Sequence, residues 1–234
     1  MRNIERRDRQ MLYISDEEVF QEQLPARRLT QKLNTVDRSD FAAITAICRE
    51  LLPNCADPFI NPPFYCDYGT HIHCRGSMFM NYNCTILDVS RVVIGENFQA
   101  GPNVAIYSAS HPLHPAARNT GYELGMDVII GDNVWLGGNT VVCPGVTIGS
   151  NVVIGAGSVV TRDIPPYTVA VGVPAKPVKQ RFSDEVVCRL LDTAWWELPG
   201  EVIRANYPLF NAQPDGEGLT LLEDLCREFR RNCP

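Results

Sequence analysis

The chain has 234 residues and 45% hydrophobic composition, which is enough to bury a core and excludes a largely disordered protein. Its 21 Lys and Arg against 27 Asp and Glu give a net charge of -6, without the basic excess that nucleic-acid binding needs. No apolar stretch follows the charged N-terminus, and no segment reaches about 18 apolar residues. We therefore expect a soluble, cytoplasmic protein with no nucleic-acid or membrane partner.

The nine cysteines are scattered along the sequence, odd in number and never spaced as C-x2-C. This pattern argues against both a disulfide framework and a zinc site. We expect reduced thiols that act mostly as small apolar residues of the core.

Residues 1–60 are predicted to form an N-terminal helical cap. Apolar residues recur at helical spacing in segments 16–20, 24–33 and 41–52. Ser39 or Asp40 is a suitable N-cap for the last segment. We expect three short helices, or two and a turn, which cover one end of the domain that follows.

Residues 61–180 carry a repeat of six residues, a period that no helix has. Gly131, Gly137, Gly149 and Gly155 lie on one six-residue grid, and Cys143 occupies its missing position. An aliphatic residue precedes each grid position, and a second, mostly apolar row also repeats every six residues. One inward aliphatic residue and one small residue at a bend predict a parallel β-helix, whereas antiparallel hairpins would alternate with period two.

Segment 108–125 interrupts the repeat. It contains two His-Pro pairs and two glycines. Long insertions in a regular scaffold often carry function, so we predict that this extruded loop belongs to the active site.

Residues 181–234 are predicted to form a C-terminal helical cap. Ser183 is a suitable N-cap, because two acidic residues and then an apolar stripe at helical spacing follow it. Trp195 and Trp196 come after the stripe. We expect both rings to pack against the open end of the β-helix rather than to stack on a ligand.

The sequence resembles the hexapeptide-repeat acyltransferases, and among them the maltose, galactoside and nodulation-factor O-acetyltransferases. The resemblance covers about residues 10–180, in which the cap, the repeat and the insert follow one another in the same order. It implies an all-β core, a left-handed parallel β-helix with helical caps at both ends. It also implies a homotrimer that binds acetyl-CoA between neighbouring subunits. The tail instead resembles the C-terminal cap of the xenobiotic acetyltransferases. The motifs that carry the resemblance are Cys66 to Gly69, Asn81 to Asn83, Leu87 to Asp88, His111 to Gly125, Val134 to Gly138, Cys143 to Gly145, Val160 to Pro165 and, in the tail, Arg181 to Asn206.

By this resemblance, His111 in the extruded loop is the catalytic base. An imidazole, with an ordinary pKa near 6.5, can take the proton of an alcohol as the oxygen attacks a thioester. The sequence has no G-x-S-x-G nucleophile motif, which fits direct transfer without an acyl-enzyme. A backbone N–H near Gly137 and Gly138 is expected to stabilise the oxyanion. His114 is expected to be a solvated or loop-stabilising residue.

The acceptor contacts implied by the resemblance are Asp16 in the cap, Asp67 and Asn81. Asp88 is a further candidate, with support of a turn as its alternative role. Carboxylates and amides suit polyols because they form hydrogen bonds with vicinal hydroxyls. Gln23 takes a position where galactoside-specific relatives carry arginine. We therefore expect a cationic contact to be missing and leave the identity of the sugar open.

The resemblance also implies contacts to acetyl-CoA. Gly138 and Ala156 are small enough for the pantetheine arm to lie along the β-helix. The nucleotide phosphates are expected to meet a set of polar and basic residues. This set consists of Thr161, Arg162, Lys176 and Lys179.

The sequence thus predicts an acetyl-CoA-dependent O-acetyltransferase that acts on a hydroxyl of a sugar or a sugar-like polyol. The alternative is O-acetylation of a non-sugar small molecule, such as an antibiotic or a secondary metabolite, which the tail favours and the insert disfavours. A catalytically inactive β-helix would lack the loop histidine or the basic residues, and both are present. A metal-dependent β-helix would need three converging histidines, and the four present occur in two pairs, so we expect no metal.

Overall fold

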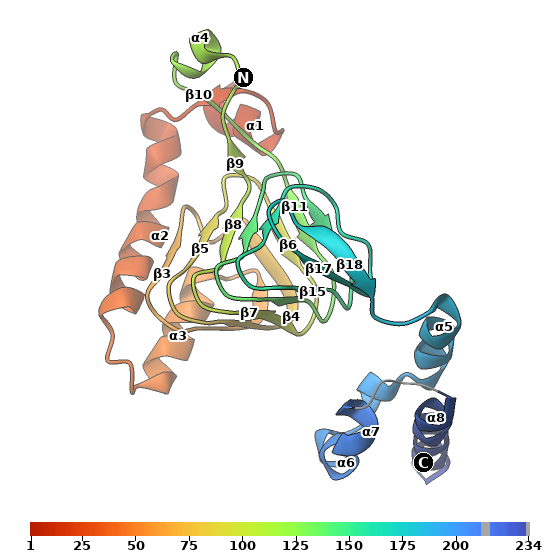
Figure 1. Cartoon of the computed structure of the whole chain (residues 1–234). Coiled ribbons are helices and arrows are strands. Elements are labelled where there is room, and N and C mark those ends of the chain that lie inside the picture. The colour runs from red at the N-terminus through yellow and green to blue at the C-terminus, as the bar shows by residue number, and fades with distance from the viewer. Residues whose placement is uncertain (212–215, 233–234) are drawn as a thin grey trace. The chain divides into compact units, whose positions relative to one another are not determined.

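The computed structural model describes residues 1–211 and 216–232 (Figure 1). The chain divides into two compact units, the first ending at Lys179 and the second starting at Gln180. Each unit has a hydrophobic core of its own. In the described part of the chain, no helix is both long and apolar enough to cross a membrane.

The N-terminal cap consists of α1 (Asn3–Asp8), α2 (Glu17–Thr35) and α3 (Phe41–Leu51). Helix α2 joins the two segments that we expected to be separate, with Pro25 inside it. Asp40 caps α3 as predicted, because its carboxylate accepts a hydrogen bond from the Ala43 N–H at 2.9 Å. Apolar residues of α2 and α3 belong to the same core cluster as the strands, so these helices cover the first coils of the β-helix.

The central domain is a left-handed parallel β-helix, in which short strands stack in parallel from coil to coil. The first strand already lies within the range that we expected for the cap, and it pairs with β4. The strands are β2 (Cys55–Ile60), β3 (Phe64–Cys66), β4 (Ile72–Met80), β5 (Cys84–Leu87), β6 (Val92–Ile94), β7 (Phe98–Ala100), β8 (Ala105–Tyr107), β11 (Val128–Ile130), β12 (Trp135–Leu136), β13 (Val141–Val142), β14 (Thr147–Ile148), β15 (Val153–Ile154), β16 (Val159–Val160), β17 (Thr168–Val171) and β18 (Lys176–Gln180).

Strand pairing confirms the six-residue repeat. Val141 pairs with Val159, eighteen positions later, so one coil holds three units of six residues. The aliphatic residues before the grid positions point inward and are at most 1% exposed. Glycine is required at position 137 because the coils stack closely there: a Cβ on Gly137 would lie only 2.5 Å from the backbone nitrogen of Ala156.

The extruded loop has the length of one coil. Val92 pairs with Val128, thirty-six positions later, which is one coil of eighteen residues plus an insert of eighteen. The insert holds β9 (Ala109–Ser110), α4 (Pro115–Arg118) and β10 (Tyr122–Gly125). Strand β10 pairs with β9 on one side and with β1 (Tyr13–Ile14) of the cap on the other. A small three-stranded sheet therefore joins the loop to the N-terminal cap.

The second unit is helical. Ser183 caps its first helix as predicted, since its hydroxyl accepts a hydrogen bond from the Val186 N–H at 3.3 Å. The ring of Trp195 packs in the core of this unit, with its centroid 5.5 Å from that of Phe210. Its packing partners thus lie within its own unit, whereas we expected the β-helix. The helices are α5 (Asp184–Thr193), η1 (Trp195–Glu197), α6 (Gly200–Ala205), α7 (Tyr207–Asn211) and α8 (Gly216–Asn232).

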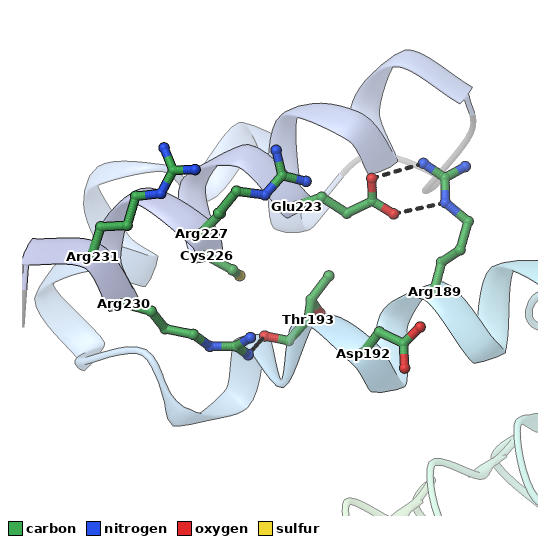
Figure 2. Close-up of a pocket in the computed structure, with 8 residues that line it drawn as sticks. All are labelled: Arg189, Asp192, Thr193, Glu223, Cys226, Arg227, Arg230 and Arg231. Atoms are coloured by element: carbon green, nitrogen blue, oxygen red, sulfur yellow. Dashed lines mark hydrogen bonds and ion pairs between the residues drawn. The ribbon is translucent and has the colours of Figure 1, made fainter.

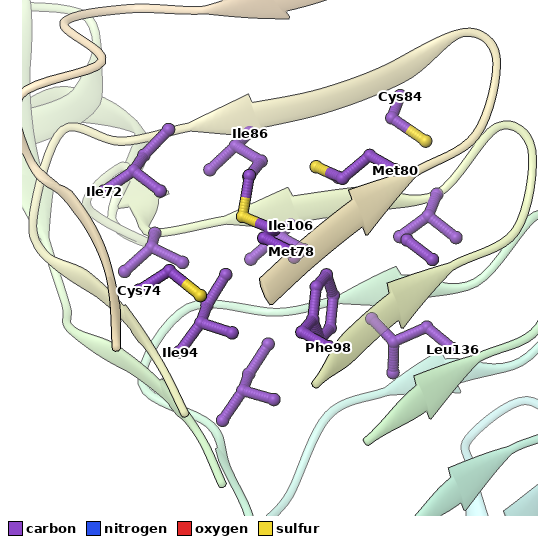
Figure 3. Close-up of a cluster of buried hydrophobic side chains, with 14 of the residues drawn as sticks. Ile72, Cys74, Met78, Met80, Cys84, Ile86, Ile94, Phe98, Ile106 and Leu136 are labelled. Carbon is purple, nitrogen blue, oxygen red and sulfur yellow. The ribbon is translucent and has the colours of Figure 1, made fainter. Parts of the chain in front are cut away.

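The described cysteines are free thiols, as predicted, and Cys233 lies outside the described residues. Cys74 and Cys84 pack among the methionine and isoleucine side chains of the β-helix core (Figure 3). Burial raises the pKa of both thiols, which disfavours the reactive thiolate. These cysteines therefore act as apolar residues of the core, whereas Cys188 is exposed.

Candidate active site

The sheet between loop and cap places His111 at the end of a strand that lies one strand away from β1 of the N-terminus. His111 follows β9 directly, and β9 pairs with β10. In the neighbouring pair of strands, Tyr13 lies opposite Glu123. Residues about a hundred positions apart in the sequence thus meet at the base of the extruded loop.

The imidazole of His111 is exposed, and its Nδ1 lies 3.4 Å from the carbonyl oxygen of Tyr122. A carbonyl oxygen only accepts hydrogen bonds, so this contact assigns the proton to Nδ1. The lone pair of Nε2 is then available for a proton. This arrangement suits a general base, because the backbone contact sets the tautomer of the ring.

Glu123 is a site residue that the sequence analysis missed. Its Oε2 accepts hydrogen bonds from the Tyr13 hydroxyl at 2.7 Å and from the Ser15 hydroxyl at 3.1 Å. Tyr13 is completely buried, and this burial is the main cause of the raised pKa of its hydroxyl. The two donors hold the Glu123 carboxylate in place at the position after the residue that contacts His111.

Asp88 is completely buried and supports a turn. Its Oδ1 accepts hydrogen bonds from the backbone N–H groups of Asp67 at 2.8 Å and Tyr68 at 3.0 Å. Within the described residues its Oδ2 has no hydrogen-bond partner, and burial raises the pKa of the carboxyl. Asp88 therefore supports a turn, the alternative role that the sequence analysis gave it, and its direct contact with the acceptor stays a prediction. In supporting the turn it positions Asp67.

Asp67 is partly buried and lies near two other carboxylates. Its pKa is raised to about 6, first by burial and then by the negative charges of Asp88 and Glu123. The positive charge of Arg27 acts in the opposite direction. The charges that shift the pKa of Asp67 thus come from three segments, which are the helical cap, a neighbouring coil and the extruded loop.

Arg27 brings a cation next to Gln23, the position where we expected a cationic contact to be missing. Gln23 is buried and donates a hydrogen bond to the Tyr68 hydroxyl at 3.2 Å. The Arg27 guanidinium donates one to Oε1 of Gln23 at 2.9 Å. Since residues i and i+4 share a helix face, an arginine one turn later brings a positive charge to the same region.

The other two predicted acceptor residues are both engaged locally. Asp16 caps α2 through the Val19 N–H at 3.1 Å, and its second oxygen accepts from the Asn3 amide at 2.7 Å. These hydrogen bonds, with that from Asn3 the largest cause, lower the pKa of Asp16. Asn81 is half-buried and uses its side-chain oxygen to accept from the Tyr82 N–H at 2.8 Å. Its side-chain NH2 group takes no part in that bond.

The predicted pantetheine contacts lie on neighbouring coils. Gly157, which follows Ala156, donates its N–H to the carbonyl of Gly138 at 2.9 Å. The N–H of Gly137 is committed, because it donates to the carbonyl of Ile154 at 2.8 Å. Of the two expected oxyanion donors, Gly138 is therefore the remaining candidate.

The predicted phosphate contacts are exposed. Thr161 and Arg162 follow β16, and both lysines lie on β18. Lys176 and Lys179 are three positions apart, and side chains of a strand alternate between its faces. The two lysines therefore point to opposite faces of β18 and do not form a single clamp.

Comparison with known proteins identifies the family. The maltose acetyltransferase hexapeptide capping motif matches residues 9–56, and the bacterial transferase hexapeptide motif (six repeats) matches residues 127–162. The galactoside O-acetyltransferase of Escherichia coli K12 is 39% identical over 165 residues, which cover 68% of this chain and 81% of that protein. The chain belongs to the hexapeptide-repeat acetyltransferases.

Solved structures agree with this assignment. A maltose O-acetyltransferase from Clostridium difficile 630 matches with a TM-score of 0.74 and 43% identity, over 77% of this chain and 97% of that chain. A galactoside acetyltransferase in complex with coenzyme A matches with a TM-score of 0.71 and 36% identity, over 77% of this chain and 91% of the other. As a member of this family, the protein is an acetyl-CoA-dependent O-acetyltransferase.

Proposed function

We propose that the protein transfers the acetyl group of acetyl-CoA directly to a hydroxyl of a sugar or a sugar-like polyol, with His111 as the general base. The observation that carries this proposal is the contact between Nδ1 of His111 and the Tyr122 carbonyl. It leaves Nε2 as the proton acceptor, and the residue after Tyr122 on β10 is Glu123, whose carboxylate is held by the Tyr13 hydroxyl.

The chemical step needs few groups. Nε2 of His111 takes the proton of the acceptor hydroxyl as its oxygen attacks the thioester carbonyl carbon. The N–H of Gly138 stabilises the resulting oxyanion. The carbon–sulfur bond then breaks, and the leaving thiolate of coenzyme A takes the proton from the imidazolium. The acetyl ester and the free thiol are the products, and His111 returns to its starting state.

The acceptor class follows from the groups near the loop. Asp67 and Glu123 supply carboxylate oxygens that accept hydrogen bonds from hydroxyls, and Arg27 supplies donors. Such a mixture suits vicinal hydroxyls better than an apolar acceptor. The names of the relatives, which include maltose and galactoside acetyltransferases, support the same class.

A homotrimer is part of this proposal. An outward row on one face of the β-helix runs from Phe59 to Phe79, then to Gln99 and Trp135 on successive coils. The rings of Phe59 and Phe79 stack with centroids 6.3 Å apart, and Trp135 is 53% exposed. An exposed row of aromatic side chains on a rigid surface supports burial against a second subunit. Light scattering should give three times the mass of one chain, and Trp135→Glu should reduce it.

The proposed acceptor is tested with a panel of acceptors at fixed acetyl-CoA. Maltose, a galactoside, glucose and an acyclic polyol form one arm, and hydroxyl-bearing antibiotics form the other. Release of the coenzyme A thiol measures turnover, and mass spectrometry locates the added acetyl group. We expect ester products with the first arm. Turnover with antibiotics alone would instead establish the non-sugar alternative.

A further inference from the structure

The C-terminal unit contains a pocket of about 450 Å³ between α5 and α8 (Figure 2). This volume falls in the range of about 300–1,000 Å³ that is typical of small-molecule sites. Acetyl transfer as described above uses none of its residues. The lining consists of Arg189, Asp192, Thr193, Glu223, Cys226, Arg227, Arg230 and Arg231.

Two of the four arginines connect α5 and α8. Arg189 of α5 forms a bidentate pair with Glu223 of α8, at 2.7 and 3.0 Å. Arg230 donates a hydrogen bond to the carbonyl of Thr193. These contacts tie the two helices together at both ends of the pocket and give it defined walls (Figure 2).

Within the described residues the other two arginines form no hydrogen bond or ion pair with α5, and of these two only Arg227 has an ion pair. Arg227 and Arg231 are four positions apart, so they share one face of α8, and Figure 2 shows them extending in the same direction. Arg227 donates to Asp224, a pair in which both side chains are more than half exposed. Within the described residues, the side chain of Arg231 has neither a hydrogen bond nor an ion pair. The helix dipole favours cations in the last turn, but it does not require them to line a pocket.

The charge of the pocket determines the kind of ligand. Its lining holds four guanidinium groups and two carboxylates, those of Asp192 and Glu223. The lining therefore carries two positive charges in excess, in a chain whose net charge is -6, and Asp224, which pairs with Arg227, lies outside the lining. A phosphate monoester carries about -1.5 to -2 at pH 7 and therefore neutralises this excess, whereas a single carboxylate would leave half of it. Guanidinium groups also match phosphate oxygens in geometry.

The carboxylate of Asp192 indicates a second feature of the ligand. Within the described part of the chain its carboxylate has no hydrogen bond or ion pair, and it lines the α5 side of the pocket. A carboxylate would repel phosphate but accepts hydrogen bonds from hydroxyl groups. We propose that this pocket binds a small phosphate monoester that also carries hydroxyls, with its phosphate on Arg227 and Arg231 and a hydroxyl on Asp192.

The experiment titrates the full chain with glucose 6-phosphate and follows the phosphorus NMR line of the ligand. We expect saturable binding by the unaltered protein and about tenfold weaker binding by Arg231→Gln, the loss typical of one charge-assisted contact. Arg204→Gln, an exposed arginine of the same unit outside the pocket, is the matched control and should bind normally. Asp192→Asn should weaken the binding of glucose 6-phosphate but not that of inorganic phosphate.

Two further arms separate this site from the site of acetyl transfer. Binding should persist when Lys176 and Lys179 are both changed to Glu, and Arg231→Gln should keep the KM for acetyl-CoA unchanged. Circular dichroism checks folding, and Arg227→Gln replaces Arg231→Gln if that variant is unfolded. Equal binding by the arginine variants and the unaltered chain would overturn the proposal. So would binding that disappears in the lysine variant, or binding of unphosphorylated glucose that equals that of the phosphate ester.

Discussion

Replacing Asp67 by Asn should stabilise the protein near neutral pH and weaken acceptor binding at the same time. Its pKa is raised from the usual 3.8 to about 6, because the carboxyl is buried and lies near other carboxylates. The folded state therefore holds the proton more tightly than the unfolded state does. As pH rises through the window between these two values, the free energy of unfolding falls, and it stays lower at higher pH. An amide does not ionise, so the variant avoids this loss.

The size of the effect follows from the shift. Two pKa units correspond to about 3 kcal/mol if the group is fully shielded from solvent. Asp67 is partly exposed, so we expect a gain of roughly 1–2 kcal/mol at neutral pH and none near pH 4. Urea unfolding followed by circular dichroism across this pH range measures the difference. Asp57→Asn, on an exposed side chain of β2, is the control and should give a curve parallel to that of the unaltered protein.

The same substitution tests the role of Asp67 in binding. The ionised carboxylate accepts hydrogen bonds from acceptor hydroxyls, so the KM of the acceptor should rise about tenfold in Asp67→Asn. In the unaltered protein the KM should rise as pH falls below about 6, where Asp67 takes up its proton. If the free energies of unfolding of Asp67→Asn and the unaltered protein change in parallel with pH, the pKa of the Asp67 carboxyl is not raised. If the KM is unchanged, Asp67 does not contact the acceptor.

Three other perturbations test the remaining parts of the site and the tail. His111→Ala should lower turnover by about 10²–10⁴ with little change in acetyl-CoA binding, whereas alanine at the second histidine of the loop should have little effect; unchanged turnover in His111→Ala would remove His111 from the mechanism. Because Lys176 and Lys179 point to opposite faces of β18, changing each singly to Glu should raise the KM for acetyl-CoA unequally, and more than that for its 3′-dephosphorylated form; equal effects on both donors would place the lysines on a solvated face. Deleting residues 200–234 removes part of the C-terminal core and should cause aggregation or proteolysis. Deleting residues 180–234 removes the whole second unit and should leave the thermal transition of the first unit and the ranking of acceptors intact. A changed ranking would place the tail in the acceptor site.

The features that depend on a local pattern could be predicted from the sequence. One side of the β-helix is six residues long, so each coil repeats the same inward and bend positions, and the pairing of Val141 with Val159 shows this period directly. The caps at Asp40 and Ser183 are equally local, because each side chain bonds to a backbone group three positions later. The extruded loop was visible as a break in a strict period.

The contacts that shape the site could not be predicted, because they join segments that only the coiling brings together. Glu123 meets Tyr13 across 110 positions, and no pattern in either segment marks the other. Arg27 lies one helical turn after Gln23, and its proximity to Asp67 depends on how α2 packs on the β-helix. Asp88 was a candidate for either an acceptor contact or a turn, and the hydrogen bond from the Asp67 N–H that supports the turn depends on the neighbouring coils, which bury Asp88.

The three-stranded sheet links acceptor binding to the catalytic loop. Strand β10 supplies both the carbonyl that contacts His111 and the carboxylate of Glu123, while the cap supplies Tyr13, which holds that carboxylate. Long loops on a rigid scaffold are generally mobile. Pairing with β1 restricts the extruded loop at the residues next to the base. Since the same cap carries Arg27 and Asp16, we expect the segment proposed to bind the acceptor also to fix the position of the proposed base, so that a change in the cap affects both.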